Sequence, residues 1–176
     1  DKIKSVIGLR AENFVQKYTG ENSGGTVKYD DEKVIDKLDI FPSTNFIYSL
    51  KENSNLRLAY SKTTARPSFK EVSIAEIYDP LSNMTFNGNI NLKPSYIDNL
   101  DLRYELFGED NQLFAISGFY KSFKDPIELT YYEASTENFQ PKNLGNAKVY
   151  GLELELRKQI SQSLGINLNA SIIESR

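Results

Sequence analysis

Apolar and polar residues alternate along most of this chain of 176 residues, and this alternation constrains its fold more than any other feature. Neighbouring side chains of a β-strand point to opposite faces, whereas the apolar residues of a helix recur every three or four positions. The alternation is sharpest in the segment 147–158. Its apolar residues are Tyr150, Leu152, Leu154 and Leu156, and the residues interleaved with them are Gly151, Glu153, Glu155 and Arg157. The sequence therefore predicts long strands, each with one apolar and one polar face.

Seven segments follow this pattern and predict an all-β fold. Their ranges are 2–18, 38–50, 55–65, 96–107, 112–124, 147–158 and 164–173. The segment 112–124 is apolar on both sides, so the pattern does not assign its faces, and it can continue through Pro126 to Tyr131. We expect an antiparallel β-meander of about seven long strands, because consecutive antiparallel strands can be joined by short turns.

The connections between these segments alternate strictly between long and short. The long connections are 19–37, 66–95 and 132–146, and the short ones are 51–54, 108–111 and 159–163. The short ones are rich in the Gly, Asn, Asp and Ser residues that hairpin turns need. A meander connected in this way has two unlike ends, as transmembrane β-barrels do. The predicted strands are also long enough for a tilted membrane crossing, which takes roughly 9 to 11 residues.

The two faces of the predicted strands fit the two environments of such a barrel. The apolar face would contact lipid and the polar face would line the lumen. Tyr60, Tyr104, Tyr120 and Tyr150 are candidates for the aromatic girdles at the membrane interface. The alternative is a soluble β-sandwich, such as a carbohydrate-binding or adhesive module, in which two apolar faces pack against each other. The residue pattern leaves both folds open.

Composition excludes several classes of function. The chain has no Cys and no His, which excludes disulfide scaffolds, thiolate zinc sites and a Ser-His-Asp triad. Its 21 basic and 24 acidic residues give a net charge of −3, which argues against non-specific binding of nucleic acid. No apolar run reaches the roughly 18 residues of a membrane-spanning helix. The only methionine is Met84, so we expect the chain to be a processed product or a piece of a longer one.

Four motifs lie on or beside the predicted strands. In chain order they are Phe41–Ser43 with Leu56–Thr63 and Arg66–Phe69, then Gly88–Pro94, then Phe119–Lys121 with Asp125–Ile127, and finally Asn143–Ala147 with Gly151–Glu153. In type, order and spacing they resemble the barrel of TonB-dependent outer-membrane receptors of gram-negative bacteria. Two positions depart from that family's pattern, since Ile90 stands where Pro is usual and Ser95 where Glu is usual. The resemblance extends from about Val6 to Ile173.

The resemblance implies a segment of a 22-stranded transmembrane β-barrel in the bacterial outer membrane. Residues 1–176 would form part of one outer-membrane β-barrel domain, without its plug domain and remaining strands. The end at Glu174–Arg176 also lacks the terminal aromatic residue of the family's last strand. Receptors of this family take up a scarce nutrient, which can be a siderophore, haem, cobalamin or an oligosaccharide.

The same resemblance implies the partners. These would be the TonB complex, reached through the absent plug, as well as outer-membrane lipid, the small-molecule or oligosaccharide ligand and a surface lipoprotein. It implies no enzymatic activity, no cofactor and no nucleic-acid partner. We expect the isolated segment to self-associate, because an open meander exposes two strand edges and a lipid-facing surface.

The third long connection carries the aromatic candidates for contact with a ligand. Tyr131 and Tyr132 stand at its start and Phe139 lies within it, where the rings could stack on a sugar or on a planar chelate. Tyr131 fits a place in the interface girdle equally well. Gly88–Pro94 could be a phosphate-binding loop, but a single glycine without a following helix favours a turn.

Charged residues on the predicted polar faces are further candidates. Glu153 and Glu155 lie two positions apart on one strand, so their carboxyls share a face. They could act together in a glycosidase-like enzyme, or they could pair with Arg103 or Arg157 in the lumen. We expect the ion pairs, because no general base or metal ligand accompanies the two acids.

Acidic residues also gather in the first long connection, at Asp30–Glu32, with Asp36 and Asp39 near them. Carboxylate oxygens are the ligands that Ca²⁺ prefers. The spacing is not that of an EF-hand, so we expect a solvated run of charge in a loop and no metal site.

Overall fold

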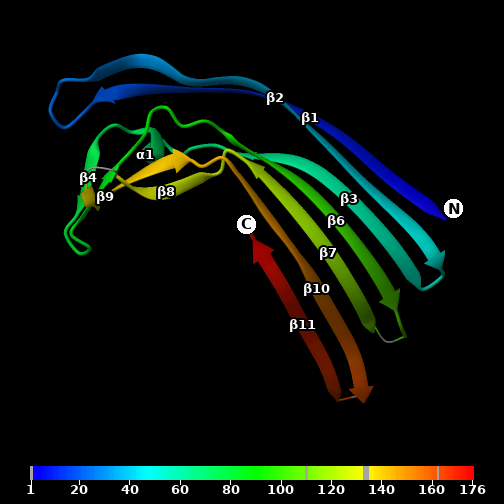
Figure 1. Cartoon of the computed structure of the whole chain (residues 1–176). Coiled ribbons are helices and arrows are strands. Elements are labelled where there is room, and N and C mark those ends of the chain that lie inside the picture. The colour runs from blue at the N-terminus through cyan, green and yellow to red at the C-terminus, as the bar shows by residue number, and fades with distance from the viewer. Residues whose placement is uncertain (1, 110, 133–134, 162) are drawn as a thin grey trace.

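The computed structural model of the chain describes residues 2–109, 111–132, 135–161 and 163–176. Seven long strands form one antiparallel sheet whose spatial order follows the chain (Figure 1). They are β1 Ile3–Glu21, β2 Lys28–Lys51, β3 Ser54–Ala65, β6 Ser95–Phe107, β7 Leu113–Lys124, β10 Asn146–Ser161 and β11 Leu164–Ser175. The predicted all-β meander is confirmed, whereas closure into a barrel of 22 strands stays a prediction. The short turns lie at one end of the sheet, the turn end, and the long connections at the other, the loop end (Figure 1).

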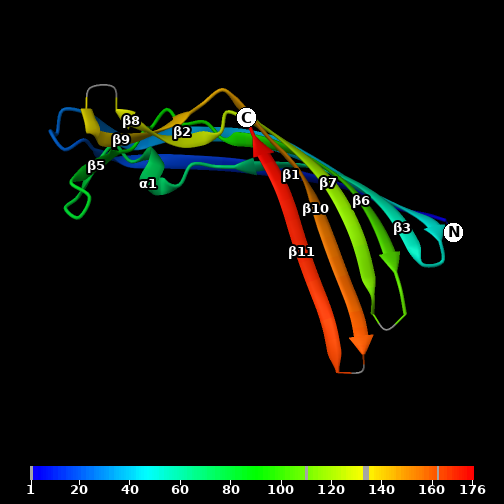
Figure 2. The same cartoon turned by 60° about the horizontal axis from the view of Figure 1, so that its bottom comes forward.

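A smaller sheet of four strands lies at the loop end (Figures 1 and 2). Its strands are β4 Glu76–Asp79, β5 Met84–Asn87, β8 Ile127–Tyr132 and β9 Ser135–Asn143, in the spatial order β4-β5-β9-β8. One helix, α1 Phe69–Val72, precedes it in the chain. The sequence pattern predicted loops for β4, β5 and β9, and that prediction was wrong. Among the described residues, no helix has the length and apolar character needed to cross a membrane.

The strand β8 does not continue β7, although the sequence pattern allowed it. Asp125 between them has a φ of 54°, a left-handed conformation that interrupts an extended chain. Pro126 follows and has no N–H to donate to a neighbouring strand. The segment from Ile127 to Tyr132 therefore pairs with β9 in the small sheet.

The first hairpin is much longer than the sequence pattern predicted. β1 and β2 stay paired as far as Glu21 and Lys28, so residues 22–27 connect them instead of 19–37. The Asn22 side chain accepts hydrogen bonds from the N–H groups of Thr26 and Val27 at 2.8 and 3.0 Å, which closes the turn. The acidic residues of 30–36 consequently lie on β2 and not in a loop.

The register of the large sheet sets residues of like character side by side. One row consists of Tyr48, Leu56, Tyr104, Ile116, Leu154 and Ala170. The next row, on the other face, consists of Ile47, Arg57, Arg103, Ser117, Glu153 and Ser171. We call these surfaces the apolar face and the polar face. The register also assigns β7, whose Phe114, Ile116, Gly118 and Tyr120 belong to the apolar face.

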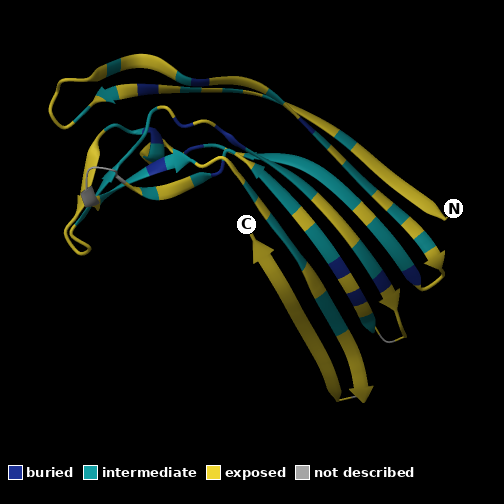
Figure 3. Cartoon of the chain, viewed as in Figure 1, coloured by how far each residue is buried: buried dark blue, intermediate teal, exposed yellow. Residues whose placement is uncertain are grey.

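The apolar face is exposed over much of its area, and exposed residues recur along the strands of the large sheet (Figure 3). Ile7 and Ile172, for example, are 77% and 79% exposed. A β-sandwich would bury such a face under a second sheet. The small sheet lies at the loop end instead (Figure 2), so the structure does not support the sandwich alternative.

A buried core lies at the loop end. Tyr18, Val72 and Leu92 come from three separate parts of the chain and are buried together. The Tyr18 hydroxyl accepts a hydrogen bond from the N–H of Ile74 at 3.2 Å and lies 3.3 Å from the Ser73 hydroxyl. The first hairpin, α1 and the connection before β6 therefore form one packed unit.

Candidate functional site

A chain of alternating charges crosses the polar face. The buried carboxylate of Glu105 on β6 accepts hydrogen bonds from the Nε–H groups of Arg57 and Arg103, each at 2.9 Å. Arg103 also donates to Glu155 on β10 at 2.7 Å, and the guanidinium of Arg157 lies 3.5 Å from the same carboxylate. We call these five residues the charge network. It connects β3, β6 and β10 across the polar face.

The middle of the charge network is partly shielded from solvent. The Glu105 side chain is 9% exposed, and those of Arg103 and Glu155 are 28% and 29% exposed. Charge-assisted hydrogen bonds in such surroundings are stronger than exposed ion pairs, and removal of one partner leaves the other charge uncompensated. The network therefore stabilises the pairing of β3 with β6, ties β6 to β10 across the intervening β7, and gives the polar face a fixed pattern of charge.

The sequence-based expectation for the two glutamates holds for one of them. Glu155 pairs with both Arg103 and Arg157, as predicted. Glu153 lies on the same face, opposite Ser117 and Ser171, and among the described residues it has no ion-pair partner. The site therefore consists of paired charges, and Arg57 and Glu105 are members that the sequence analysis did not select.

A second ionic cluster lies beyond the point where β2 and β3 separate. Arg66 donates to Glu12 on β1 at 2.6 Å, and its guanidinium lies 3.8 Å from Asp39 on β2. The Tyr96 hydroxyl on β6 donates to Asp39 at 2.7 Å. The Arg66 guanidinium also lies 4.4 Å from the centre of the Phe14 ring. Arg66 thus connects the first hairpin to the rest of the polar side.

The acidic residues of the first hairpin pair with lysines. Lys17 forms an ion pair with Asp31, and Lys33 pairs with Asp36 at 2.9 Å. The hydrogen bond to Asp36 raises the pKa of Lys33 above its usual value. Within the ranges that the structure describes, no three metal-ligating side chains gather in one place.

The motif Gly88–Pro94 forms a close contact with α1, and the predicted turn is confirmed. The N–H of Asn89 donates to the carbonyl of Glu71 at 2.6 Å. A Cβ at Gly88 would lie 1.9 Å from the carbonyl oxygen of Ser73, so this position accepts no side chain. The glycine serves the approach of two backbones and not the binding of a phosphate.

The last long connection joins the same unit through its own motif. The Asn143 side chain accepts a hydrogen bond from the N–H of Lys93 at 2.9 Å and donates to the Lys93 carbonyl at 3.0 Å. The same amide donates to the carbonyl of Asp125 at 2.8 Å. The side chain of Asn89 reaches the carbonyl of Pro141 at 3.1 Å. These hydrogen bonds give the loop end a defined shape.

An aromatic row crosses the small sheet. The register sets Tyr131, Phe139 and Phe86 directly beside one another on β8, β9 and β5, and we call these three residues the aromatic row. The Tyr131 and Phe139 rings are 4.9 Å apart at their centres. The ammonium of Lys70 on α1 lies 4.6 Å from the centre of the Phe86 ring. Tyr131 is 59% exposed, so the row is accessible at one end.

The structure brings together two of the three predicted aromatic candidates. Tyr131 and Phe139 stack in the small sheet, which rules Tyr131 out of the row of interface tyrosines in the large sheet. The backbone of Tyr132 ends β8, while its side chain lies outside the described residues. Sequence analysis missed Phe86 and Lys70, because only the pairing of β5 with β9 reveals their place.

Three of the four predicted girdle tyrosines do form a row. Tyr60, Tyr120 and Tyr150 lie in one row of the apolar face with Leu100 between the first two. Tyr104 lies four residues further toward the turn end, beside Leu56 and Ile116, so it is not part of this row, and its place in a girdle stays a prediction.

The family model described as the outer membrane protein beta-barrel family matches residues 1–176. The chain belongs to this family. We call residues 1–176 the barrel segment. It therefore resides in the outer membrane, as predicted, and its exposed apolar face has the character of a lipid-facing surface. None of the curated proteins compared with the segment matches it.

Solved structures share the fold of the barrel segment. The copper transporter OprC has a TM-score of 0.74 at 18% identity, covering 100% of this chain and 27% of that one. The siderophore receptor PirA from Pseudomonas aeruginosa has a TM-score of 0.68 at 19% identity, covering 78% and 28%. The FrpB iron transporter from Neisseria meningitidis has a TM-score of 0.68 at 17% identity, covering 100% and 24%. The barrel segment thus spans about a quarter of the length of these proteins.

These comparisons confirm the resemblance to outer-membrane receptor barrels at the level of family and fold. The solved structures that share the fold are those of outer-membrane receptors and transporters and not of enzymes. The plug, the TonB complex, a lipoprotein partner and the identity of the ligand stay predictions.

Proposed function

We propose that the barrel segment forms part of the wall and mouth of a TonB-dependent receptor that takes up a scarce nutrient. The observation that carries this proposal is the combination of a two-faced meander with a packed loop end. A barrel that only lines a pore needs the meander, whereas a receptor also needs an ordered surface outside the membrane. Residues 1–176 would belong to one barrel domain, and the plug and other strands would come from the rest of a longer protein.

The polar face would line the lumen in this account. A charged, hydrated wall suits a barrel interior, and the charge network keeps its strands in register. Arg103, Glu153 and Glu155 are then candidates for contact with the plug or with the passing ligand. Energy from the TonB complex would act on the plug, while the wall would remain in place.

We further propose that the nutrient is a metal ion held by a non-macrocyclic organic chelator, here called a metal chelate, rather than haem, cobalamin or an oligosaccharide. The neighbours in fold include a siderophore receptor, an iron transporter and a copper transporter. The aromatic row supports an organic chelator, because aromatic rings pack well against each other. Lys70 beside the row favours a chelate with negative charge. Tyr131, Phe139 and, next to them, Tyr132 are the proposed contacts.

The first test concerns the barrel itself. The full-length protein is extracted from outer membranes and run on an SDS gel with and without boiling. We expect faster migration without boiling, because a closed barrel has no free strand edges and resists SDS until it is heated. An unchanged mobility, together with recovery in the soluble fraction, would refute the proposal and return attention to a secreted binding module.

The second test concerns the ligand and uses ferric catecholate as the probe. In full-length protein, Tyr131→Ala combined with Phe139→Ala should weaken binding roughly tenfold, as the loss of two ring contacts of about 0.5–1.5 kcal/mol each predicts. The matched control is Tyr78→Ala, which removes an equally exposed ring from the other face of the same sheet. Normal heat-dependent mobility without any binding of the probe would refute the metal-chelate class and leave the barrel account standing.

A further inference from the structure

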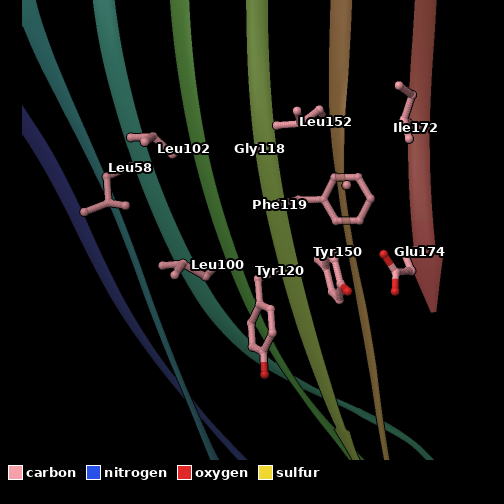
Figure 4. A pocket seen from close by; sticks show the side chains of 11 residues that line it. Leu58, Leu100, Leu102, Gly118, Phe119, Tyr120, Tyr150, Leu152, Ile172 and Glu174 are labelled. Carbon is pink, nitrogen blue, oxygen red and sulfur yellow. The ribbon is translucent and has the colours of Figure 1, made fainter. Parts of the chain in front are cut away.

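The apolar face has a hollow near its centre. Gly118 on β7 has no side chain, and Leu102 and Leu152 flank it in the same row (Figure 4). The rings of Tyr120 and Tyr150 lie on the loop-end side of this hollow (Figure 4). Its volume is about 540 Å³, and it is lined mainly by apolar side chains.

A close contact explains why residue 151 is a glycine, but no such contact explains the glycine at position 118. A Cβ at Gly151 would lie 2.9 Å from the Phe119 ring on the polar face and 2.4 Å from the carbonyl oxygen of Ile172. A Cβ at Gly118 would lie 3.4 Å from the Leu152 side chain and 3.9 Å from the carbonyl oxygen of Gly151, which are ordinary contacts. Gly118 is therefore not required by a close approach of backbone. Its effect is to leave an apolar space open toward the lipid.

Two lysines stand on the loop-end side of the tyrosines. Lys148 precedes Tyr150 by two residues and Lys124 follows Tyr120 by four, so both share the side of the sheet that carries the hollow. Lys124 pairs with Asn146, which makes it a diagonal neighbour of Lys148. Both lysines are exposed, and neither has an ion-pair partner within the described part of the chain.

Two carboxylates on the side of the sheet that carries the hollow already have hydrogen-bond or ion-pair partners. Asp98 accepts a hydrogen bond from the Tyr60 hydroxyl at 2.6 Å. Glu174 pairs with Arg176 at 2.7 Å. In the described part of the chain, the region between the tyrosine row and the loop end therefore has Lys124 and Lys148 as exposed cations without an ion-pair partner, while Lys62, in the row of Lys148, lies over the Tyr96 ring.

The spacing along β7 matches the depth of one leaflet. Six residues separate Gly118 from Lys124, which corresponds to about 20 Å along the strand. A strand tilt of about 40° reduces this to a height of roughly 15 Å, half of the hydrocarbon thickness of about 30 Å. A molecule that reaches from the hollow to the lysines would thus be about as long as one acyl chain with its headgroup, and the tyrosine row, two residues from Gly118, lies along its length.

We propose that this surface binds an anionic membrane lipid that carries phosphate on its headgroup. An acyl chain would lie in the hollow over Gly118, and the headgroup would lie beyond the rings of Tyr120 and Tyr150. Lys124 and Lys148 would donate charge-assisted hydrogen bonds to the phosphate. A free phosphate would leave the apolar half of the site without a partner, so the lipid is the ligand.

The test measures lipid retained by the full-length protein in detergent, using native mass spectrometry. The probes are dimyristoyl phosphatidylglycerol and, as the zwitterionic comparison, dimyristoyl phosphatidylcholine. We expect Gly118→Leu, which fills the hollow, and the pair Lys124→Gln with Lys148→Gln each to lower retention of phosphatidylglycerol about fivefold. The matched control, Lys51→Gln with Lys158→Gln, also removes two lysine charges, at the turn ends of β2 and β10, and should retain the lipid.

The outcomes distinguish this site from general lipid contact. Equal retention in all variants, or equal retention of both lipids by the unchanged protein, would overturn the proposal. Displacement of the lipid by inorganic phosphate alone would also overturn it, because the phosphate would then suffice. Heat-dependent gel mobility confirms that each variant is folded. If Gly118→Leu does not fold, Gly118→Ala adds one methyl group at 3.4 Å from Leu152 and should give a smaller loss.

Discussion

Replacement of Glu105 by Gln is the substitution that tests the charge network most sharply. Gln has nearly the same size and keeps one carbonyl oxygen as an acceptor, but it removes the negative charge between Arg57 and Arg103. Its amide N–H₂ would also face a guanidinium, where no acceptor is available. The variant therefore isolates the contribution of charge from that of packing.

The structure sets the expected magnitude. A hydrogen bond to a charged group contributes about 1.5–3 kcal/mol, and Glu105 accepts two of them. The Arg57 side chain is 40% exposed, so solvent screens its share, and Gln retains part of the other bond. We expect Glu105→Gln to lower the free energy of unfolding by about 2–3 kcal/mol.

The assay is urea unfolding of full-length protein in detergent, followed by far-ultraviolet circular dichroism. Glu153→Gln is the matched control, since Glu153 shares the polar face but has no ion-pair partner among the described residues. This control should change stability by less than about 0.5 kcal/mol. Equal stabilities of the two variants would refute the reasoning, because the network would then contribute no more than a solvated carboxylate does.

Two further predictions concern the loop end. Gly88→Ala should separate the motif 88–94 from α1, because the new methyl group would lie 1.9 Å from the Ser73 carbonyl oxygen, and protease added to intact cells should then cleave this region. Gly24→Ala, where a Cβ finds only distant contacts, should stay resistant, and cleavage of neither variant would contradict the structure. Tyr18→Phe removes a hydroxyl that accepts a hydrogen bond from the N–H of Ile74, and it should lower the free energy of unfolding by about 1 kcal/mol in the same urea titration. An unchanged midpoint would show that this hydrogen bond does not stabilise the core.

The long strands could be predicted from the sequence because one physical rule governs them. A strand between lipid and water must alternate, so the segment 55–65 was placed within one residue of β3. The rule does not apply beyond the membrane, and there the loops predicted in place of the long first hairpin and of β4, β5 and β9 were wrong. In the first hairpin, Val34 and Ile35 are adjacent apolar residues, and register shifts interrupt the pairing, so β2 gave no alternating signal before residue 38.

The small sheet could not be predicted for a different reason. β4 and β5 have four residues each, too few for a pattern to be visible. β5 pairs in parallel with β9, more than fifty residues away, and such a pairing depends on the packing of the whole loop end. The helix α1 has a readable signal in Ser68 and Glu71, which form a capping box, but a helix of four residues gives no periodicity.

The residues of the candidate site likewise divide into those that the sequence pattern predicted and those that it missed. The pairing of Glu155 with Arg103 followed from their shared face, which alternation reveals. The role of Glu105 depends on the register between β3 and β6, and the place of Phe86 depends on the pairing of β5. Register between strands is fixed by turns and cross-strand contacts together, so a single sequence identified the faces and not the partners.

The measurement that tests the central claim most directly is the accessibility of the two faces in a membrane. The chain has no cysteine, so single cysteines at positions 150–157 of the full-length protein can each carry a spin label. In lipid bilayers, the account predicts collisions with oxygen at Leu152 and the other even positions, and little at Glu153 and the other odd positions. Oxygen collisions without this alternation, or with the opposite one, would contradict the claim that the apolar face contacts lipid.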